Sequence, residues 1–168
     1  MSNIIIGTAG HIDHGKTALI RALNGFEGDS TNEEKQRGIT IDLSFSNLNR
    51  AERNIAFIDV PGHEKLIKNM IAGAFGFDYV MLVVSAKEGL MPQTIEHIEI
   101  LSLLGIKNLI LVITKKDLVD EKILKEQEDK IVEFLNESEF NIKFIKAVSI
   151  YDETSIKDLK HTLFTLSK

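Results

Sequence analysis

Residues 10–17, Gly-His-Ile-Asp-His-Gly-Lys-Thr, constrain the fold of this chain more than any other stretch. They match the pattern GxxxxGK[ST], and they lie between the apolar run Ile4–Ile6 and a segment with helical spacing of apolar residues. A glycine-rich loop between a strand and a helix turns backbone N–H groups inward beside the helix N-terminus, and this combination binds phosphate. The motif therefore predicts an α/β domain that binds a nucleotide. The alternative is a merely glycine-rich turn.

The residue types of this loop have separate roles at a bound nucleotide. Lys16 would neutralise the β- and γ-phosphate oxygens, and the Thr17 hydroxyl would bind Mg²⁺. Nucleotide contacts are expected along the whole turn and the first helical residues, namely at Gly10, Ile12, Asp13, His14, Gly15, Lys16, Thr17 and Ala18.

Apolar runs alternate with longer segments of helical period along the rest of the chain, which is typical of βαβ units. The runs at 79–85 and 108–114 are almost continuously apolar, as expected for strands that are covered on both faces. The sequence predicts the α/β class, with a mostly parallel six-stranded sheet flanked by helices. Strands are expected at residues 3–8, 41–48, 54–60, 79–85, 108–114 and 141–148, and helices are expected to begin at Lys16, near Glu64, after Pro92, near Glu121 and near Ser155.

Two of the predicted helices have further expected features. The helix after Pro92 should carry Ile95, Ile98 and Leu101 inward and end at Gly105, because glycine adopts the left-handed conformation that closes a helix. The charged segment at 121–133 is interpreted as a solvated helix face with the i,i+4 pairs Glu121/Lys125 and Glu126/Lys130. His97 and His161 also fall in predicted helices, where packing or surface roles are expected.

Composition narrows the class of protein further. The chain has 168 residues, no cysteine, 43% hydrophobic residues and 27% charged residues, which fits one globular domain. The absence of cysteine excludes disulfides, thiolate metal sites and cysteine nucleophiles. A net charge of −5 argues against a non-specific nucleic-acid surface. No apolar run approaches the ~18 residues of a membrane span and the N-terminus lacks a basic signal-peptide start, so a cytoplasmic protein without a membrane partner is expected.

Asp59 ends an apolar run and precedes Val-Pro-Gly-His-Glu at 60–64. A carboxylate at the end of a strand beside a phosphate loop can hold Mg²⁺ through a water molecule. Gly62 can offer its N–H to the γ-phosphate, and His63 is the candidate that orients the attacking water. The alternatives are that Asp59 is only a turn residue and that His63 is a surface residue at a helix start.

Arg37-Gly38-Ile39-Thr40 closes a long polar stretch that begins at Asn24. The Thr40 hydroxyl could complete the Mg²⁺ coordination while its backbone detects the γ-phosphate, as in loops that this group orders. The alternative is a threonine that merely begins a strand. The residues predicted to take part in hydrolysis are therefore Lys16, Thr40 and His63.

Thr114-Lys115-Lys116-Asp117 follows another apolar run. The Asp117 carboxylate can accept hydrogen bonds from the N1–H and the exocyclic amine of guanine, and the Lys115 stem can lie over the base. Lysine-rich loops that end in Asp are common, so the motif gains its weight from its place after a complete phosphate apparatus. The residues predicted to form the base site are Thr114, Lys115, Asp117, Leu118, Ser149 and Ile150.

The motifs GHIDHGKT, RGIT, DVPGHE and TKKD, in this order, resemble the GTPase domain of the elongation-factor-Tu-like translational factors over essentially the whole chain. Three further features are similar to the SelB family of selenocysteine-specific elongation factors. They are Gly7-Thr8-Ala9 before the loop, Glu33-Glu34-Lys35 before RGIT, and the short interval between the threonines of the phosphate loop and of RGIT.

The resemblance implies a P-loop GTPase, or G domain, that spans residues 1–168 as the N-terminal domain of a longer factor. It implies that Thr17 and Thr40 ligate Mg²⁺ in the GTP state and that Asp59 acts through water. It also implies a monovalent cation such as K⁺ beside Asp13. Ile12 and Ile39 match the apolar pair that gates the catalytic histidine, which is His63 here.

The resemblance also implies an activity and partners. Hydrolysis of GTP to GDP and phosphate would be slow until a ribosome stimulates it, selenocysteinyl-tRNA would be the cargo, and an mRNA hairpin would bind C-terminal domains beyond this one. The alternatives are another elongation-factor-Tu-like GTPase, or a nucleotide-gated binding module with incidental hydrolysis.

The sequence departs from the family pattern in three places. Thr114 replaces the usual Asn and is expected to make fewer bonds between base and phosphate loop, which would lower nucleotide affinity. Ile150 replaces a small residue, which is tolerable if only its backbone contacts the base. Residues 29–32 lack the Arg-Leu-Pro expected before Glu-Glu-Lys.

Overall fold

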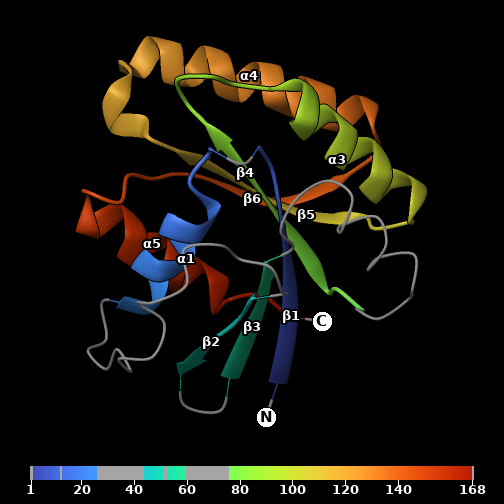
Figure 1. Ribbon diagram of the computed structural model, residues 1–168, viewed down its shortest axis with the longest axis vertical. Helices are drawn as coiled ribbons and strands as arrows, with labels where there is room; N and C mark the ends of the chain where they lie inside the picture. Colours follow the sequence, from blue (N-terminus) through green and yellow to red (C-terminus); the bar gives the residue numbers. More distant parts are fainter. Residues whose placement is uncertain (1, 12, 26–43, 51–52, 60–75, 168) are drawn as a thin grey trace.

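The computed structural model describes residues 2–11, 13–25, 44–50, 53–59 and 76–167 (Figure 1). The predicted helix near Glu64 and residues 41–43 of the predicted second strand lie outside these ranges. The described elements, in chain order, are β1 Ser2–Ala9, α1 Lys16–Gly25, β2 Ser44–Arg50, β3 Arg53–Asp59, β4 Tyr79–Ser85, α3 Pro92–Leu103, β5 Asn108–Thr114, the 3₁₀ turn η1 Lys116–Leu118, α4 Glu121–Glu137, β6 Asn141–Ala147 and α5 Glu153–Leu163.

The strands form one six-stranded sheet in the order β2-β3-β1-β4-β5-β6. All neighbours pair in parallel except β2, which runs antiparallel to β3. The predicted α/β class with a mostly parallel six-stranded sheet is therefore confirmed. β1 is central, with β3 and β2 on one side of it and β4, β5 and β6 on the other, so the strand order changes direction at β1. In such sheets ligands bind beyond the carboxyl ends of the strands at this switch point.

Helices cover both faces of the sheet, with α1 and α5 on one face and α3 and α4 on the other (Figure 1). Side chains of the central strands alternate between the two cores, so that Met81 and Val83 face α1 and α5 while Val80 and Leu82 face α3 and α4. Every side chain of β4 is buried. This double burial explains why β4 and β5 read as continuous apolar runs and why their predicted bounds match the structure.

The end of α3 matches its prediction. Gly105 has φ 72°, and the Ile106 N–H donates to the Leu101 carbonyl oxygen at 3.1 Å, which closes the helix as a Schellman motif does. Ile98 and Leu101 are buried, whereas Ile95, also predicted to point inward, is only half-buried.

One expectation for helix α4 is wrong. Lys125 pairs with Asp129 at 2.8 Å and with Glu128 at 3.5 Å rather than with Glu121, because two carboxylates are within its reach on that side.

Helix α5 begins at Glu153, near Ser155 as expected. The Asp152 side chain accepts a hydrogen bond from the Ser155 N–H and caps the helix there.

The segment after α5 is tied to the strands beneath it. Arg53 of β3 donates to the carbonyl oxygens of Phe164 and Leu166, and the Tyr79 hydroxyl donates to the Ser167 carbonyl oxygen. The Arg50 guanidinium lies 5.8 Å from the centre of the Phe164 ring. Among the helices described, none is long and apolar enough to cross a membrane.

Candidate nucleotide-binding site

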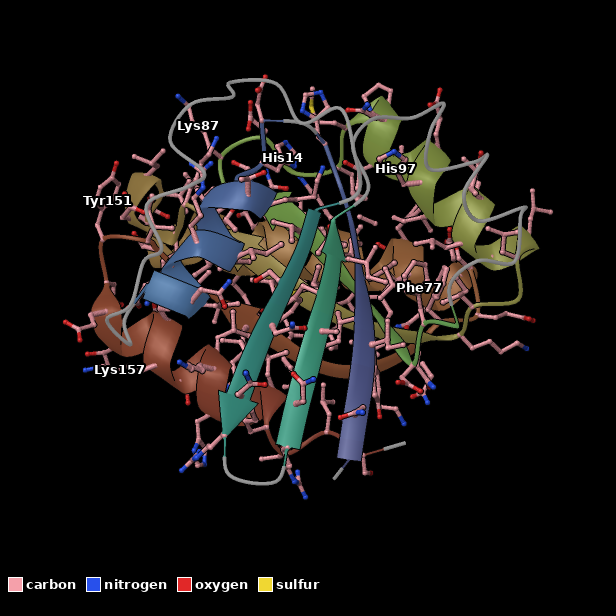
Figure 2. The ribbon with its side chains drawn as sticks, turned by 60° about the horizontal axis from the view of Figure 1, so that its bottom comes forward. His14, Phe77, Lys87, His97, Tyr151 and Lys157 are labelled. Atoms are coloured by element: carbon pink, nitrogen blue, oxygen red, sulfur yellow. The ribbon has the colours of Figure 1, made fainter. Side chains whose placement is uncertain are left out.

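The predicted site residues that the structure describes meet at the carboxyl ends of β1, β5 and β6. Figure 2 shows His14 beside the start of α1 and His97 on α3, both at this end of the sheet. The loops that follow these strands carry the phosphate motif, the TKKD motif and Ser149. Parallel strand order alone therefore brings together segments that are about a hundred residues apart.

Glycine is required at both ends of the phosphate loop. Gly10 has φ 133°, and a Cβ there would collide with the Val83 carbonyl oxygen. Gly15 has φ 84°, and the direction of its absent Cβ is open space. Both conformations are ones that side-chain-bearing residues rarely adopt. The backbone therefore curves tightly while the space above Gly15 stays free for a ligand.

Lys16 and Thr17 form the first turn of α1. The Lys16 ammonium donates to the Gly10 carbonyl oxygen at 2.6 Å and to that of His11 at 3.3 Å, so it lies across the mouth of the loop. Thr17 is exposed, and Ala18 is half-buried. The first N–H groups of a helix have no acceptor within the helix and carry its positive dipole end, which suits a phosphate.

Two side chains of the TKKD segment bind the phosphate loop. The buried Thr114 hydroxyl donates to the His14 carbonyl oxygen at 2.7 Å, and the Lys115 ammonium donates to the Asp13 carbonyl oxygen at 2.9 Å. The Thr114 hydroxyl therefore bonds to the phosphate loop although threonine replaces the usual Asn. The fewer bonds expected from this replacement do not include this contact. Lys115 has φ 57°, which is uncommon for a residue with a side chain and persists only where surrounding contacts hold it.

The remaining base-site residues surround the end of β6. Asp117 and Leu118 are exposed in η1, and Ile150 is 41% exposed. The Ser149 N–H donates to the Ser155 hydroxyl at 3.1 Å, so this N–H is already engaged. Within the described residues, the Ile150 N–H has no hydrogen-bond acceptor. Of these two N–H groups, that of Ile150 is therefore the one left to donate to a ligand, as far as the described residues show.

An ion pair joins the two base-site segments. The Lys116 ammonium lies 2.7 Å from the Asp152 carboxylate, and this neighbour lowers the pKa of Asp152. Ser155, whose N–H is capped by Asp152, donates its hydroxyl to the Asp152 carbonyl oxygen at 2.8 Å. The ion pair and these hydrogen bonds together fix the spacing between η1 and the loop after β6.

His14 is a fully buried, uncharged component of the phosphate loop. Burial lowers its pKa from 6.5 to about 4, against the raising effect of Glu88, whose carboxylate lies 3.3 Å from His14 Nε2. Burial would raise the pKa of Glu88 itself, but the Ser85 hydroxyl and Lys115, at 3.6 Å, hold it below its usual value. Glu88 therefore stays charged between the phosphate loop and Lys115.

Several predicted residues lie outside the described part of the chain. These are Ile12, Ile39, Thr40, Gly62 and His63, together with the side chain of Asp59. Asp59 is the last residue of β3, and its backbone pairs with Thr8 of β1, two residues before Gly10 of the phosphate loop. Within the described ranges, no three His, Asp or Glu side chains are grouped so that they could hold a metal ion.

Sequence reasoning missed Glu88, His97, Lys116, Asp152 and Ser155. The sequence could have indicated His97, because it lies on the inner face of α3, where a buried polar side chain needs a hydrogen-bond partner. Asp152 and Ser155 had the spacing of a helix cap. Glu88 carried no local signal.

A glycine-rich phosphate loop bonded to a base-reading loop, at the switch point of a parallel sheet, defines a P-loop GTP-binding domain. Residues 1–167 match the family described as "Elongation factor Tu GTP binding domain". The chain belongs to this family, in which GTP is the nucleotide and is hydrolysed.

The resemblance to SelB factors is confirmed by individual relatives. The chain is 47% identical over 165 residues to the selenocysteine-specific elongation factor of Desulfomicrobium baculatum, covering 98% of this chain and 26% of that protein. It is 47% identical over 138 residues to that of Escherichia coli, covering 82% of this chain and 22% of that protein. The chain thus spans about a quarter of the length of these curated relatives.

Solved structures of selenocysteine-specific elongation factors are also similar to this chain. The crystal structure of a bacterial selenocysteine-specific elongation factor superposes with a TM-score of 0.81 and 43% identity, covering 99% of this chain and 29% of that one. SelB from Methanococcus maripaludis, in complex with the GTP analogue GppNHp, gives a TM-score of 0.78 and 33% identity, covering 98% and 34%.

Proposed function

We propose that residues 1–168 are the G domain of a selenocysteine-specific elongation factor, and that this domain binds and hydrolyses GTP as the factor's switch. The observation that carries the proposal is the attachment of the TKKD segment to the phosphate loop through Thr114 and Lys115. These bonds support the proposal because they hold the segment expected to read the base at a fixed distance from the loop expected to bind the phosphates.

Guanine recognition follows from the directions of donors and acceptors. Asp117, exposed at the loop tip, would accept from the N1–H and the exocyclic amine, which adenine does not present together. The Ile150 N–H would donate to O6. Leu118 and the Lys115 stem offer apolar surface to the base. Adenine would leave Asp117 with an unpaired charge, and such mismatches reject ligands strongly.

The residues at the start of α1 would bind the phosphates and the metal ion. Lys16, which already donates to the loop carbonyls, would donate at the same time to the β- and γ-phosphates. The exposed Thr17 hydroxyl supplies an oxygen ligand of the kind Mg²⁺ prefers. Thr40 would add a second ligand, and Asp59 would act through water. Asp13 would contribute to a site for K⁺. Bound Mg²⁺ supplies charge neutralisation at the phosphates.

Hydrolysis would depend on positioning. Lys16 and the loop N–H groups stabilise charge on the transferred group, while His63 orients the attacking water behind Ile12 and Ile39. Unstimulated switches of this type turn over at ~10⁻⁴ s⁻¹. The ribosome would accelerate the reaction by bringing His63 to the water.

The rest of the factor would hold its other ligands. Selenocysteinyl-tRNA and an mRNA hairpin would bind segments beyond this domain, in keeping with its net charge of −5. We propose a cytoplasmic location for the factor, because translation occurs there. The second candidate, a nucleotide-gated binding module, would use the same nucleotide site without stimulated hydrolysis.

The test is GTP hydrolysis with and without ribosomes, comparing the full-length wild-type factor with His63→Ala. We expect stimulated turnover in the wild type and its collapse in the variant, with GTP affinity retained. Stimulated turnover that survives in His63→Ala would remove the assigned role. No stimulation in the wild type would favour the binding module.

A further inference from the structure

His97 is a buried histidine with an acceptor role. It is 5% exposed and lies on the inner face of α3 with Thr94, Ile98 and Leu101. Its Nδ1 accepts a hydrogen bond from the Gly10 N–H at 3.2 Å, a contact between residues 87 positions apart. An imidazole nitrogen that accepts has no proton, so the contact assigns the tautomer with the proton on Nε2.

The Gly10 N–H needs this acceptor because the sheet no longer supplies one. Pairing of β1 with β3 ends at Thr8, and pairing with β4 ends at Ala9. Gly10 is buried and leaves the sheet with φ 133°. A buried N–H without a partner is costly, so an acceptor from α3 stabilises this backbone conformation.

The other backbone group of Gly10 reaches the phosphate-binding lysine. The Gly10 carbonyl oxygen accepts from Lys16 Nζ at 2.6 Å. The His97 contact holds the Gly10 N–H in one direction, and the nearby Val83 carbonyl oxygen leaves no room for any residue with a side chain at this position. That direction sets where the carbonyl oxygen, and with it the Lys16 ammonium, is placed.

We propose that His97 is a positioning residue: it fixes Gly10 and, through the Gly10 carbonyl, holds Lys16 where the nucleotide phosphates bind. Helix α3 is thereby coupled to the nucleotide site through His97. The proposal rests on the proposed function in one respect, namely that Lys16 binds phosphates.

Side-chain geometry gives a matched pair of variants. In His97→Asn the amide oxygen can occupy nearly the position of Nδ1 and accept the same bond. His97→Leu fills the space with no acceptor, and His97→Gln places its amide one bond farther out. His161→Leu, at an exposed position of α5, is the control for removing a histidine.

The first measurement is amide hydrogen exchange at Gly10 by NMR, without nucleotide. We expect exchange about five-fold faster in His97→Leu than in the wild type, as one lost hydrogen bond gives, and near wild-type exchange in His97→Asn. Equal exchange in the wild type and His97→Leu would overturn the contact. If His97→Leu does not fold, His97→Gln replaces it and the same comparison decides.

The second measurement is the dissociation rate of fluorescent GDP. We expect release about five-fold faster in His97→Leu, within about two-fold of wild type in His97→Asn, and unchanged in His161→Leu. Equal acceleration in the Asn and Leu variants, or none in either, would overturn the positioning role. A wild type that binds no guanine nucleotide would contradict the proposed function instead, and exchange at Gly10 would still test His97.

Discussion

At the base site, individual N–H and hydroxyl groups determine which contacts a bound base can make. Ser149 and Ile150 are neighbours, yet only Ile150 keeps a free N–H, because Ser155 takes the other. The sequence placed both residues correctly at the end of β6 but carried no pattern for which N–H is engaged. Likewise, the Thr114 hydroxyl donates to the His14 carbonyl oxygen of the phosphate loop, a contact that the residue type alone did not predict.

Replacing Asp117 should change which base is bound. In Asp117→Asn the side chain can donate to the C2 oxygen of xanthine but no longer accepts both guanine protons. We expect GTP affinity to fall by at least about ten-fold, as losing charged hydrogen bonds gives, and xanthosine triphosphate affinity to rise. Competition against fluorescent GDP measures both, and an unchanged preference for GTP would contradict the guanine contact.

Thr114→Val should weaken nucleotide binding with little change in shape. The substitution leaves the buried His14 carbonyl without its donor, which costs about 1–3 kcal/mol, partly through the phosphate loop. GDP affinity should therefore fall by about five-fold or more in a titration, while Thr162→Val on α5 leaves it unchanged. Equal affinities in wild type and Thr114→Val would show that the bridge does not support the loop.

Acid should destabilise the domain through His14. The group has a pKa of about 4 when folded and 6.5 when unfolded, so between these values the unfolded chain binds more protons. The free energy of unfolding therefore falls as pH drops through this window, by at most about 3 kcal/mol. The charges that face His14 are Glu88, His11, Lys115 and Lys16.

Denaturant unfolding at several values from about pH 5 to pH 7 measures this slope. His14→Gln should flatten it, whereas His161→Gln should leave it unchanged. A slope of the same size in His14→Gln would assign the acid sensitivity to other groups.

At the scale of elements, local pattern and burial predict most of the fold. β4 and β5 are bounded by polar residues and buried on both faces, so their limits could be read directly. The first residue of α5 is set by the Asp152 side chain, and the prediction came within two residues of it without using this cap. The contacts His97–Gly10 and Lys115–Asp13 span 87 and 102 residues, and no local period encodes them.

The caps of α4 and α5 offer a matched comparison of two aspartates. Asp120 caps α4 through the Ile123 N–H, and Asp152 caps α5 while also pairing with Lys116. Asp120→Ala and Asp152→Ala should each lower stability by about 1 kcal/mol in thermal unfolding. Only Asp152→Ala should also weaken GDP binding, because it releases the base-site loop. Equal GDP affinities in the two variants would contradict the role of the ion pair.

For the whole molecule, the sheet order is what turns scattered motifs into one site. The phosphate loop, the TKKD segment and the loop after β6 all follow strands whose carboxyl ends lie at one edge. The chain as a whole is negatively charged, and Lys16 and Lys115 lie at the carboxyl ends of the strands. Such a local positive charge suits a phosphorylated ligand rather than an extended nucleic acid.

The most direct test of this account is equilibrium binding of fluorescent GDP to the wild-type domain with Mg²⁺, followed by competition with unlabelled GDP, GTP and ATP. Guanine nucleotides should displace the probe, and ATP should fail to do so at a concentration at least about a hundred-fold higher. Displacement by ATP at concentrations similar to GTP, or no binding of the probe at all, would contradict the assignment of this chain as a guanine-nucleotide switch.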